Sequence, residues 1–246
     1  MKVFFTIVLI TIFITGNAQQ KAILLKPERV FDGVEMHNDW VVVLKGNLIL
    51  YAGPQTSTLK SDSTISMPGQ TLLPGLIEGH SHLFLHPYNE TQWNDQVLKE
   101  SRVERLVRAV NHAKATLMAG FTMVRDLGTE GAGYDDVGLK QSINKGLTPG
   151  PRMVVAGRAI VATGSYGPKS DNVELNLIKG AEESGGNDLT TTVRNQIGHG
   201  VDLIKIYADY RWGLNNSSAP TFSIDEIKNI VEVAKTAGRP VAAHAS

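Results

Sequence analysis

The chain has 246 residues, contains no cysteine, and carries 24 basic and 24 acidic side chains, so its formal net charge is zero. This balance gives no electrostatic reason to expect nucleic acid or an anionic membrane surface as a partner. Without cysteine, disulfides and thiolate metal sites are excluded, and any metal must be held by His, by carboxylates or by a less common ligand.

The first 18 residues have the three-part pattern of a secretory signal peptide. Lys2 precedes an apolar stretch, residues 3–14, that is too short to span a bilayer as a stable helix. Gly16-Asn17-Ala18 then supplies small residues for cleavage after Ala18. We expect the mature protein to be periplasmic or secreted by a bacterium, with no membrane association after cleavage. A retained membrane anchor is the alternative.

Residues 19–70 have the pattern of short strands separated by turns. Strands are expected at residues 22–25, 40–45 and 47–51, and the Lys45-Gly46-Asn47 turn predicts a hairpin between the last two. This segment is a small β unit that shows no chemistry of its own.

From Thr71 onward, predicted strands alternate with predicted helices. The strands are expected at residues 72–77, 121–127, 152–161, 201–207 and 240–244, and the helices at residues 96–118, 136–144, 189–197 and 224–237. In the first helix the apolar residues recur at helical spacing, which predicts that Val103 and Val107 face the core while Arg105 and His112 face solvent.

This alternation predicts a parallel sheet with right-handed crossovers. Because polar residues directly follow several strands, we expect an α/β fold containing the first five strands of a (β/α)₈ TIM barrel, with its site at the C-terminal ends of the strands. A doubly wound open sheet is the alternative. Five strands are three fewer than such a barrel needs, and the chain ends two residues after His244. We therefore expect residues 71–246 to be a truncated barrel domain.

His80 and His82 are the first candidate metal ligands. They stand two residues apart at the end of the first predicted barrel strand, so their side chains point to the same side. Two imidazoles directed at one point are what a shared metal ion requires. The alternative is a pair of structural loop histidines.

Lys205 is the second candidate, because apolar neighbours place it in a strand that is buried on both faces. A buried lone ammonium tends toward the neutral amine, which can capture carbon dioxide to form an anionic carbamate able to bridge two metal ions. The alternative is a lysine paired with a carboxylate across the barrel. His244 is the third candidate, since it follows the fifth apolar strand and has small neighbours. These groups lie at the ends of strands one, four and five, and we expect them to converge at one mouth.

These motifs resemble the amidohydrolase superfamily, and within it the imidazolonepropionase-like and Xaa-Pro dipeptidase (prolidase) branch. The resemblance covers essentially the whole mature chain, and it rests on residues 71–82, 122–128, 150–152 and 202–206. It implies a TIM barrel and a small β-sandwich made from both chain ends, so that residues 19–70 form half of the sandwich.

The resemblance also implies a ligand set. His80 and His82 would bind the more buried of two divalent metal ions, Zn²⁺ being expected, carboxylated Lys205 would bridge the two ions, and His244 would bind the second. A histidine after strand six and an aspartate after strand eight, which the family needs, lie outside these 246 residues. The hypothesis is hydrolysis of small amides, dipeptides in particular, by a hydroxide that the two metal ions activate.

Two departures from the family concern the surroundings of this site. Glu78 replaces the usual aspartate, outside the ligand set, and Gly164-Ser165-Tyr166-Gly167 replaces a glycine-rich turn that often carries histidine. Tyr166 is therefore a candidate substrate contact. His86, in the loop after the first strand, is a second candidate.

Other readings remain open. Asp126 could orient a ligand or make a structural hydrogen bond, and residues 128–133 are expected to form a flexible loop. Hydrolysis of cyclic amides, lactones or phosphoesters by the same site is the second enzymatic reading, and an inactive metal-binding fragment is the third. We expect a small-molecule substrate, no nucleic acid, and a homo-oligomer as one option.

Overall fold

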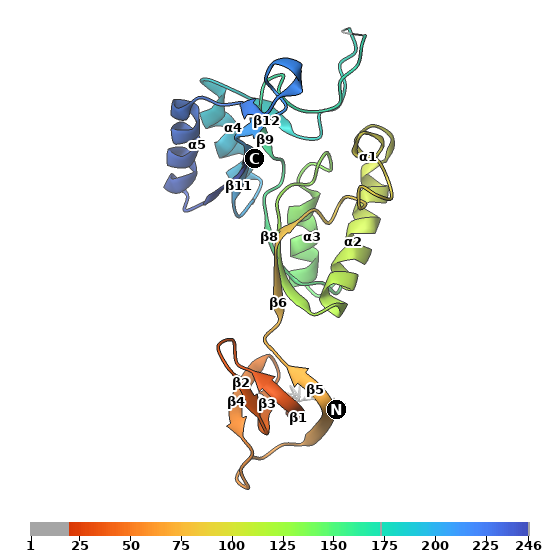
Figure 1. Cartoon of the computed structure of the whole chain (residues 1–246), viewed down its shortest axis with the longest axis vertical. Helices are drawn as coiled ribbons and strands as arrows, with labels where there is room; N and C mark the ends of the chain where they lie inside the picture. Colours follow the sequence, from red (N-terminus) through yellow and green to blue (C-terminus); the bar gives the residue numbers. More distant parts are fainter. Residues whose placement is uncertain (1–19, 173, 246) are drawn as a thin grey trace, which may run out of the picture. The chain divides into compact units, whose positions relative to one another are not determined.

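The computed structural model describes residues 20–172 and 174–245. The predicted signal peptide, residues 1–18, lies outside the described residues. The chain divides into two compact units between Pro74 and Gly75 (Figure 1). Within the described ranges, no helix combines the length and the apolar character that crossing a membrane requires.

The first unit is a β-sheet. Its strands are β1 (Ala22–Phe31), β2 (Met36–Asn38), β3 (Trp40–Lys45), β4 (Leu48–Pro54) and β5 (Ser63–Leu72). They are arranged in the order β2-β1-β3-β4, and β5 pairs in parallel with β1. The predicted hairpin is confirmed: β3 and β4 are antiparallel, and Gly46 adopts a φ of 60° in the turn between them. Leu24, Val41 and Val43 form the small core of this unit.

The second unit contains parallel strands connected by helices. The strands are β6 (Leu76–Ser81), β7 (Phe121–Asp126), β8 (Arg152–Val155), β9 (Ile160–Ala162), β10 (Glu182–Ser184), β11 (Ile204–Tyr207) and β14 (Val241–His244). The helices are α1 (Trp93–Lys99), α2 (Arg102–Met118), α3 (Asp135–Asn144), α4 (Asp188–Gly198) and α5 (Ile224–Thr236). A short hairpin, β12 (Asp209–Tyr210) and β13 (Ala219–Pro220), follows β11.

The strand order follows the chain in the first sheet but not throughout the second, where β10 pairs with the edge of β9 opposite to β11. One parallel sheet has the order β6-β7-β8 and the other the order β10-β9-β11-β14. The two sheets are linked, because the N–H of Asp202 donates to the carbonyl of Val155 at 2.8 Å. Helix α2 packs beside β7 and α3 beside β8, whereas α4 packs beside β10 and α5 beside β14. The helices are labelled in Figure 1.

The segment predicted as one helix at residues 96–118 forms two. Helix α1 ends before Glu100, which has extended backbone angles, and Ser101 begins α2 by accepting a hydrogen bond from the N–H of Glu104. The predicted core face of α2 is wrong at two positions, although Leu106, Val110 and Ala113 of the same helix pack in the core. Val103 and Val107 are 72% and 58% exposed, whereas Arg105 is only 2% exposed.

Arg105 is buried because its guanidinium donates hydrogen bonds to two loops. It donates to the carbonyl of Phe84 at 3.2 Å and to the carbonyl of Thr129 at 2.7 Å. The expectation that His112 is solvated is corrected in the same way, since its Nδ1 lies 2.9 Å from the carbonyl oxygen of Leu83. Helix α2 is therefore oriented by polar contacts to the loops that follow β6 and β7.

The strand predicted at residues 152–161 is interrupted between β8 and β9. Gly157 lies in the interruption with a φ of +68°, and a Cβ atom there would lie 2.6 Å from Cδ1 of Tyr134. Only glycine fits this position without strain. The turn is held by Asp136, whose side chain accepts a hydrogen bond from the N–H of Gly157 at 2.7 Å.

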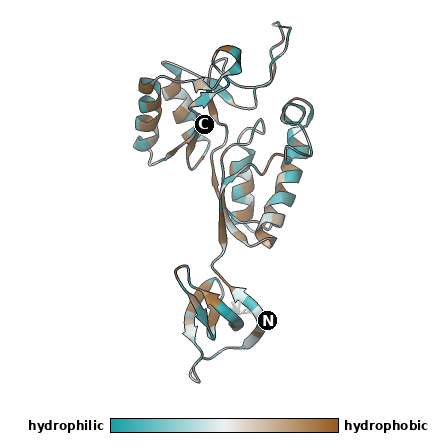
Figure 2. Cartoon of the chain, viewed as in Figure 1, coloured by the Kyte–Doolittle hydropathy of each residue, from teal (hydrophilic) through white to brown (hydrophobic). Residues whose placement is uncertain are grey.

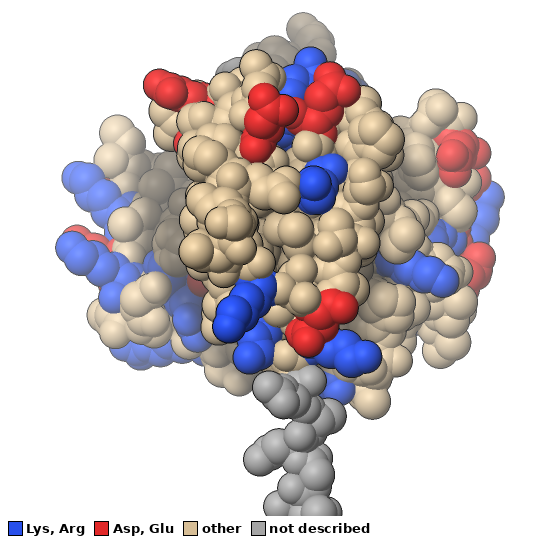
Figure 3. Space-filling model, turned by 90° about the horizontal axis from the view of Figure 1, so that it is seen from below, with Lys and Arg blue, Asp and Glu red and all other residues tan. Residues whose placement is uncertain are grey.

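The core of the second unit consists of the central strands and the helix faces that cover them. Its fully buried side chains include those of Val124, Val155, Ile160 and Ile204. The strands are accordingly coloured as hydrophobic in Figure 2, while the helices carry both characters. On the face shown in Figure 3, acidic and basic side chains are interspersed, in keeping with the zero net charge.

Candidate active site

His80 and His82 meet at the C-terminal end of β6. Their Nε2 atoms are 3.3 Å apart. The Nδ1 atom of His82 lies 2.8 Å from the carbonyl oxygen of Gly128. A carbonyl can only accept, so Nδ1 must carry the hydrogen, and the neutral ring presents the Nε2 lone pair toward His80. This is the tautomer that a metal-binding imidazole with a second-shell carbonyl adopts.

The surroundings of His80 favour its neutral form. Burial lowers the pKa of His80, and positive charge on His82, Lys205 and Arg125 lowers that pKa further. A neutral His80 offers a nitrogen lone pair at neutral pH.

Lys205 lies in the middle of β11 and is only 2% exposed. Burial lowers the pKa of its amine, and the negative charge of Glu130 opposes that effect. Among the described residues, no carboxylate oxygen lies within 4.0 Å of the amine, so the direct carboxylate partner considered from the sequence is not present there. The nearest ring is that of Tyr207, whose centroid lies 5.5 Å from Nζ. A buried amine without a carboxylate partner is shifted toward its nucleophilic neutral form.

His244 lies on the strand next to Lys205. Lys205 pairs with Ala242 and Tyr207 with His244, so Lys205, Tyr207 and His244 point to the same side of the sheet. The His244 ring stacks on the Tyr207 ring, with centroids 4.8 Å apart. In the described part of the chain, no three His, Cys, Asp or Glu side chains gather closely enough to hold a metal ion. The structure therefore brings His80 and His82 together, but His244 does not join them.

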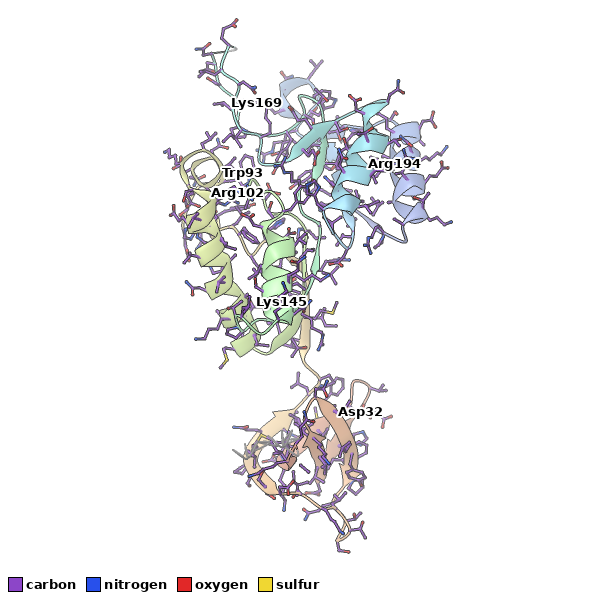
Figure 4. The ribbon with its side chains drawn as sticks, turned by 180° about the vertical axis from the view of Figure 1, so that it is seen from behind. Asp32, Trp93, Arg102, Lys145, Lys169 and Arg194 are labelled. Atoms are coloured by element: carbon purple, nitrogen blue, oxygen red, sulfur yellow. The ribbon has the colours of Figure 1, made fainter. Side chains whose placement is uncertain are left out.

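A buried carboxylate that the sequence reading did not single out lies next to the hydroxyl of Tyr207. Glu130 is 2% exposed. It accepts hydrogen bonds from the hydroxyl of Tyr166 at 2.6 Å, from Nε1 of Trp93 at 3.1 Å and from the hydroxyl of Tyr207 at 3.2 Å. Trp93, at the start of α1, is labelled in Figure 4. Four distant parts of the chain meet at this carboxylate.

The loop at residues 128–133 is therefore an ordered part of the site and not an exposed flexible segment. Thr129 is fully buried, and its hydroxyl donates to the carbonyl of Gly133 at 2.8 Å. The sequence signal for this site was Glu130, a glutamate within a glycine-rich stretch. Its hydrogen-bond partners could not be predicted, because they come from segments far apart in the sequence.

The two predicted substrate contacts differ in accessibility. Tyr166 is only 5% exposed, and burial followed by the charge of Glu130 raises the pKa of its phenol well above the ordinary value. It therefore remains protonated and donates to Glu130. The ring of His86 lies 3.6 Å from carboxylate oxygens of both Glu90 and Glu100. His86 also lines a pocket of about 450 Å³ together with His82.

The donor set fits a divalent metal ion. Two imidazole nitrogens face one another, one of them with its tautomer fixed by a carbonyl, and burial lowers the pKa of the Lys205 amine. Nitrogen donors of this kind suit Zn²⁺ and related ions.

A family model described as the amidohydrolase family matches residues 71–246. The chain belongs to the amidohydrolase family. This amidohydrolase chain is 29% identical to ochratoxinase of Aspergillus niger, an alignment that covers 87% of the chain and 47% of the relative.

Solved structures give the same picture. A Xaa-Pro dipeptidase with bound methionine matches with a TM-score of 0.76 at 26% identity, and a prolidase complexed with N-methylphosphonate-L-proline matches with a TM-score of 0.75 at 27% identity. Each match covers 91% of this amidohydrolase chain and 56% of the solved chain. The chain thus spans about half the length of the relatives it matches.

Proposed function

We propose that this chain is part of a metal-dependent amidohydrolase that cleaves amide bonds in small substrates, with dipeptides, including Xaa-Pro dipeptides, as the preferred class. The observation that carries the proposal is the His80–His82 pair, with Nε2 atoms 3.3 Å apart and the His82 ring anchored on Gly128. The similarity to a Xaa-Pro dipeptidase and to a prolidase complex supports the choice of substrate.

The parallel strands of the second unit, which helices connect, support a place within a closed (β/α)₈ barrel. The sheet of residues 22–72 supports a contribution to a β-sandwich. We further propose that two Zn²⁺ ions are the cofactor, that the mature protein is periplasmic or secreted, and that it acts without nucleic acid or membrane partners. A homo-oligomer is compatible with this proposal.

Each candidate residue then has a defined task. His80 and His82 would hold one ion through Nε2. The neutral amine of Lys205 would add to carbon dioxide, lose a proton and become a carbamate whose oxygens serve both ions, with His244 as a ligand of the second. Bound divalent ions supply a Lewis acid and lower the pKa of water to about 7. Glu130 would hold the hydroxyls of Tyr166 and Tyr207 in fixed positions beside the reacting groups.

A second candidate keeps this site and changes the bond that is cleaved. Ochratoxinase is the curated relative at 29% identity, which favours testing amides other than dipeptides, together with lactones and phosphoesters. Hydrolysis rates for Xaa-Pro dipeptides, other dipeptides and these esters separate the two candidates. If the chain binds metal but hydrolyses none of them, it is the metal-binding fragment considered from the sequence.

The test of the metal site uses single histidine replacements. Zinc content and zinc affinity are measured for the wild-type chain, for His80→Asn and for His82→Asn, with His199→Asn as the matched control. His199 is exposed and bonds only to the carbonyl of Asn195 in its own helix, apart from stacking on Tyr134. We expect each site replacement to lower zinc affinity at least about 10-fold and the control to leave it unchanged. Equal affinity in all four proteins contradicts the proposal.

A further inference from the structure

We propose that Asp126 is a positioning residue for the histidine pair, acting on His82 through the backbone of Leu83 and Gly128. This inference rests on the proposed metal site. Asp126 is the last residue of β7, pairs with Ser81 of β6, and is fully buried. Its side chain accepts two backbone hydrogen bonds, Oδ2 from the N–H of Leu83 at 3.0 Å and Oδ1 from the N–H of Gly128 at 3.1 Å.

Both donors are connected directly to His82. Leu83 is the next residue in the chain, so its N–H belongs to the peptide group that follows the His82 Cα atom. Gly128 provides the carbonyl that accepts the His82 Nδ1 hydrogen at 2.8 Å. One carboxylate therefore fixes the backbone beside His82 and also fixes the residue that orients its ring.

Neighbouring contacts leave Asp126 little freedom to act in another way. The N–H of Leu127 donates to the carbonyl of Ser81 at 2.9 Å, which clamps the end of β7 to the end of β6. Each carboxylate oxygen of Asp126 accepts one backbone N–H group, which fixes the orientation of the side chain. Groups behind the ligands of a metal site act in this way, by fixing the tautomer and orientation of a ligand ring.

The test replaces Asp126 by an isosteric amide. Asp126→Asn places an NH₂ group opposite one of the two backbone N–H donors, so one of the two hydrogen bonds cannot form. Asp136→Asn is the matched control. Asp136 is also fully buried and accepts two backbone N–H groups, from Val137 at 2.8 Å and from Gly157 at 2.7 Å.

Two measurements are made on the wild type and on both variants. The first is the ¹⁵N NMR spectrum of the His82 ring in the metal-free protein at about pH 8, above the ordinary range of imidazole protonation, which reports the tautomer. The second is zinc affinity, measured by competition with a chromophoric chelator. We expect the wild type and D136N to keep the Nδ1–H tautomer, and D126N to show a mixture together with an affinity lowered about 10- to 100-fold.

The outcomes separate this inference from the proposed function. The positioning role is overturned if D126N keeps the wild-type tautomer and binds zinc within about twofold of the wild type. Such a change in affinity is smaller than the loss expected when a residue that orients a metal ligand is replaced. If the wild type binds no zinc, the proposed function fails, while the tautomer comparison still decides the role of Asp126. If D126N does not fold, the metal-free wild type decides, because His82 found there as the Nε2–H tautomer overturns the inference.

Discussion

Replacing Glu130 by alanine should destabilise the second unit by about 3 kcal/mol. The Glu130 carboxylate accepts hydrogen bonds from Tyr166, Trp93 and Tyr207, and a hydrogen bond to a charged group contributes about 1.5 to 3 kcal/mol. The hydroxyls of Tyr166 and Tyr207 are already 3.5 Å apart and can bond to one another, so two of the three bonds are lost outright. This loss amounts to about 3 to 6 kcal/mol.

The lower end of that range is expected, because alanine also removes the desolvation cost of a buried carboxylate. Glu130→Gln is the informative comparison: its carbonyl oxygen still accepts, and a tyrosine hydroxyl can turn to accept from its amide. It should therefore cost only about 1 kcal/mol. Glu232→Ala, on the exposed face of α5, should change stability by less than about 0.5 kcal/mol.

The assay is urea unfolding followed by far-ultraviolet circular dichroism, with the free energy of unfolding extrapolated to water. The order of stability should be wild type and E232A, then E130Q, then E130A. If E130A lies within about 1 kcal/mol of the wild type, below the value of a single charged hydrogen bond, the structural role assigned to Glu130 is refuted.

Three further predictions concern stability. Burial raises the pKa of Asp126 to about 7 and that of Asp136 to about 8, so the native state keeps protons that the unfolded state has released. The free energy of unfolding should therefore decrease as the pH rises from about 5 to about 9, by at most about 5 kcal/mol per group, and a flat profile would contradict the raised pKa values. Ser223→Ala removes the capping box of α5 and should cost about 1 kcal/mol in the same assay, with no change expected if the cap were unimportant. Gly157→Ala should cost about 1 to 3 kcal/mol because of its positive φ and the contact with Tyr134, whereas Gly198→Ala, with open space at its Cβ, should be neutral or stabilising; equal effects would show that the strain is absent.

The alternation of strands and helices was readable from the sequence because each element repeats its apolar residues at its own period. The predicted β3–β4 hairpin and the helices near residues 136–144, 189–197 and 224–237 all appear in the structure with small shifts at their ends. The orientation of α2 was not predictable in the same way. Val103 and Val107 are exposed and Arg105 is buried, because hydrogen bonds to carbonyl groups of two loops act together with the apolar contacts of α2 in deciding which side faces inward.

The candidate site likewise has one part that the sequence predicted and another part that it did not. Two histidines two residues apart at the end of a strand must share a side, so local backbone geometry alone predicted the contact between His80 and His82. The partners of Glu130 come from residues 93, 166 and 207, and no local period relates them. The same holds for the link from Asp126 to His82, which passes through hydrogen bonds between two strands.

The sequence by itself determined the element types, their parallel arrangement and the presence of an imidazole pair, since these depend on residue spacing within a few positions of the chain. Only the tertiary structure decided which polar groups are buried together, that Lys205 lacks a carboxylate partner among the described residues, and how the ring of His82 is held. The physical reason is that a buried polar group must find its hydrogen-bond partner wherever the fold places one, and that partner can come from any distance along the chain.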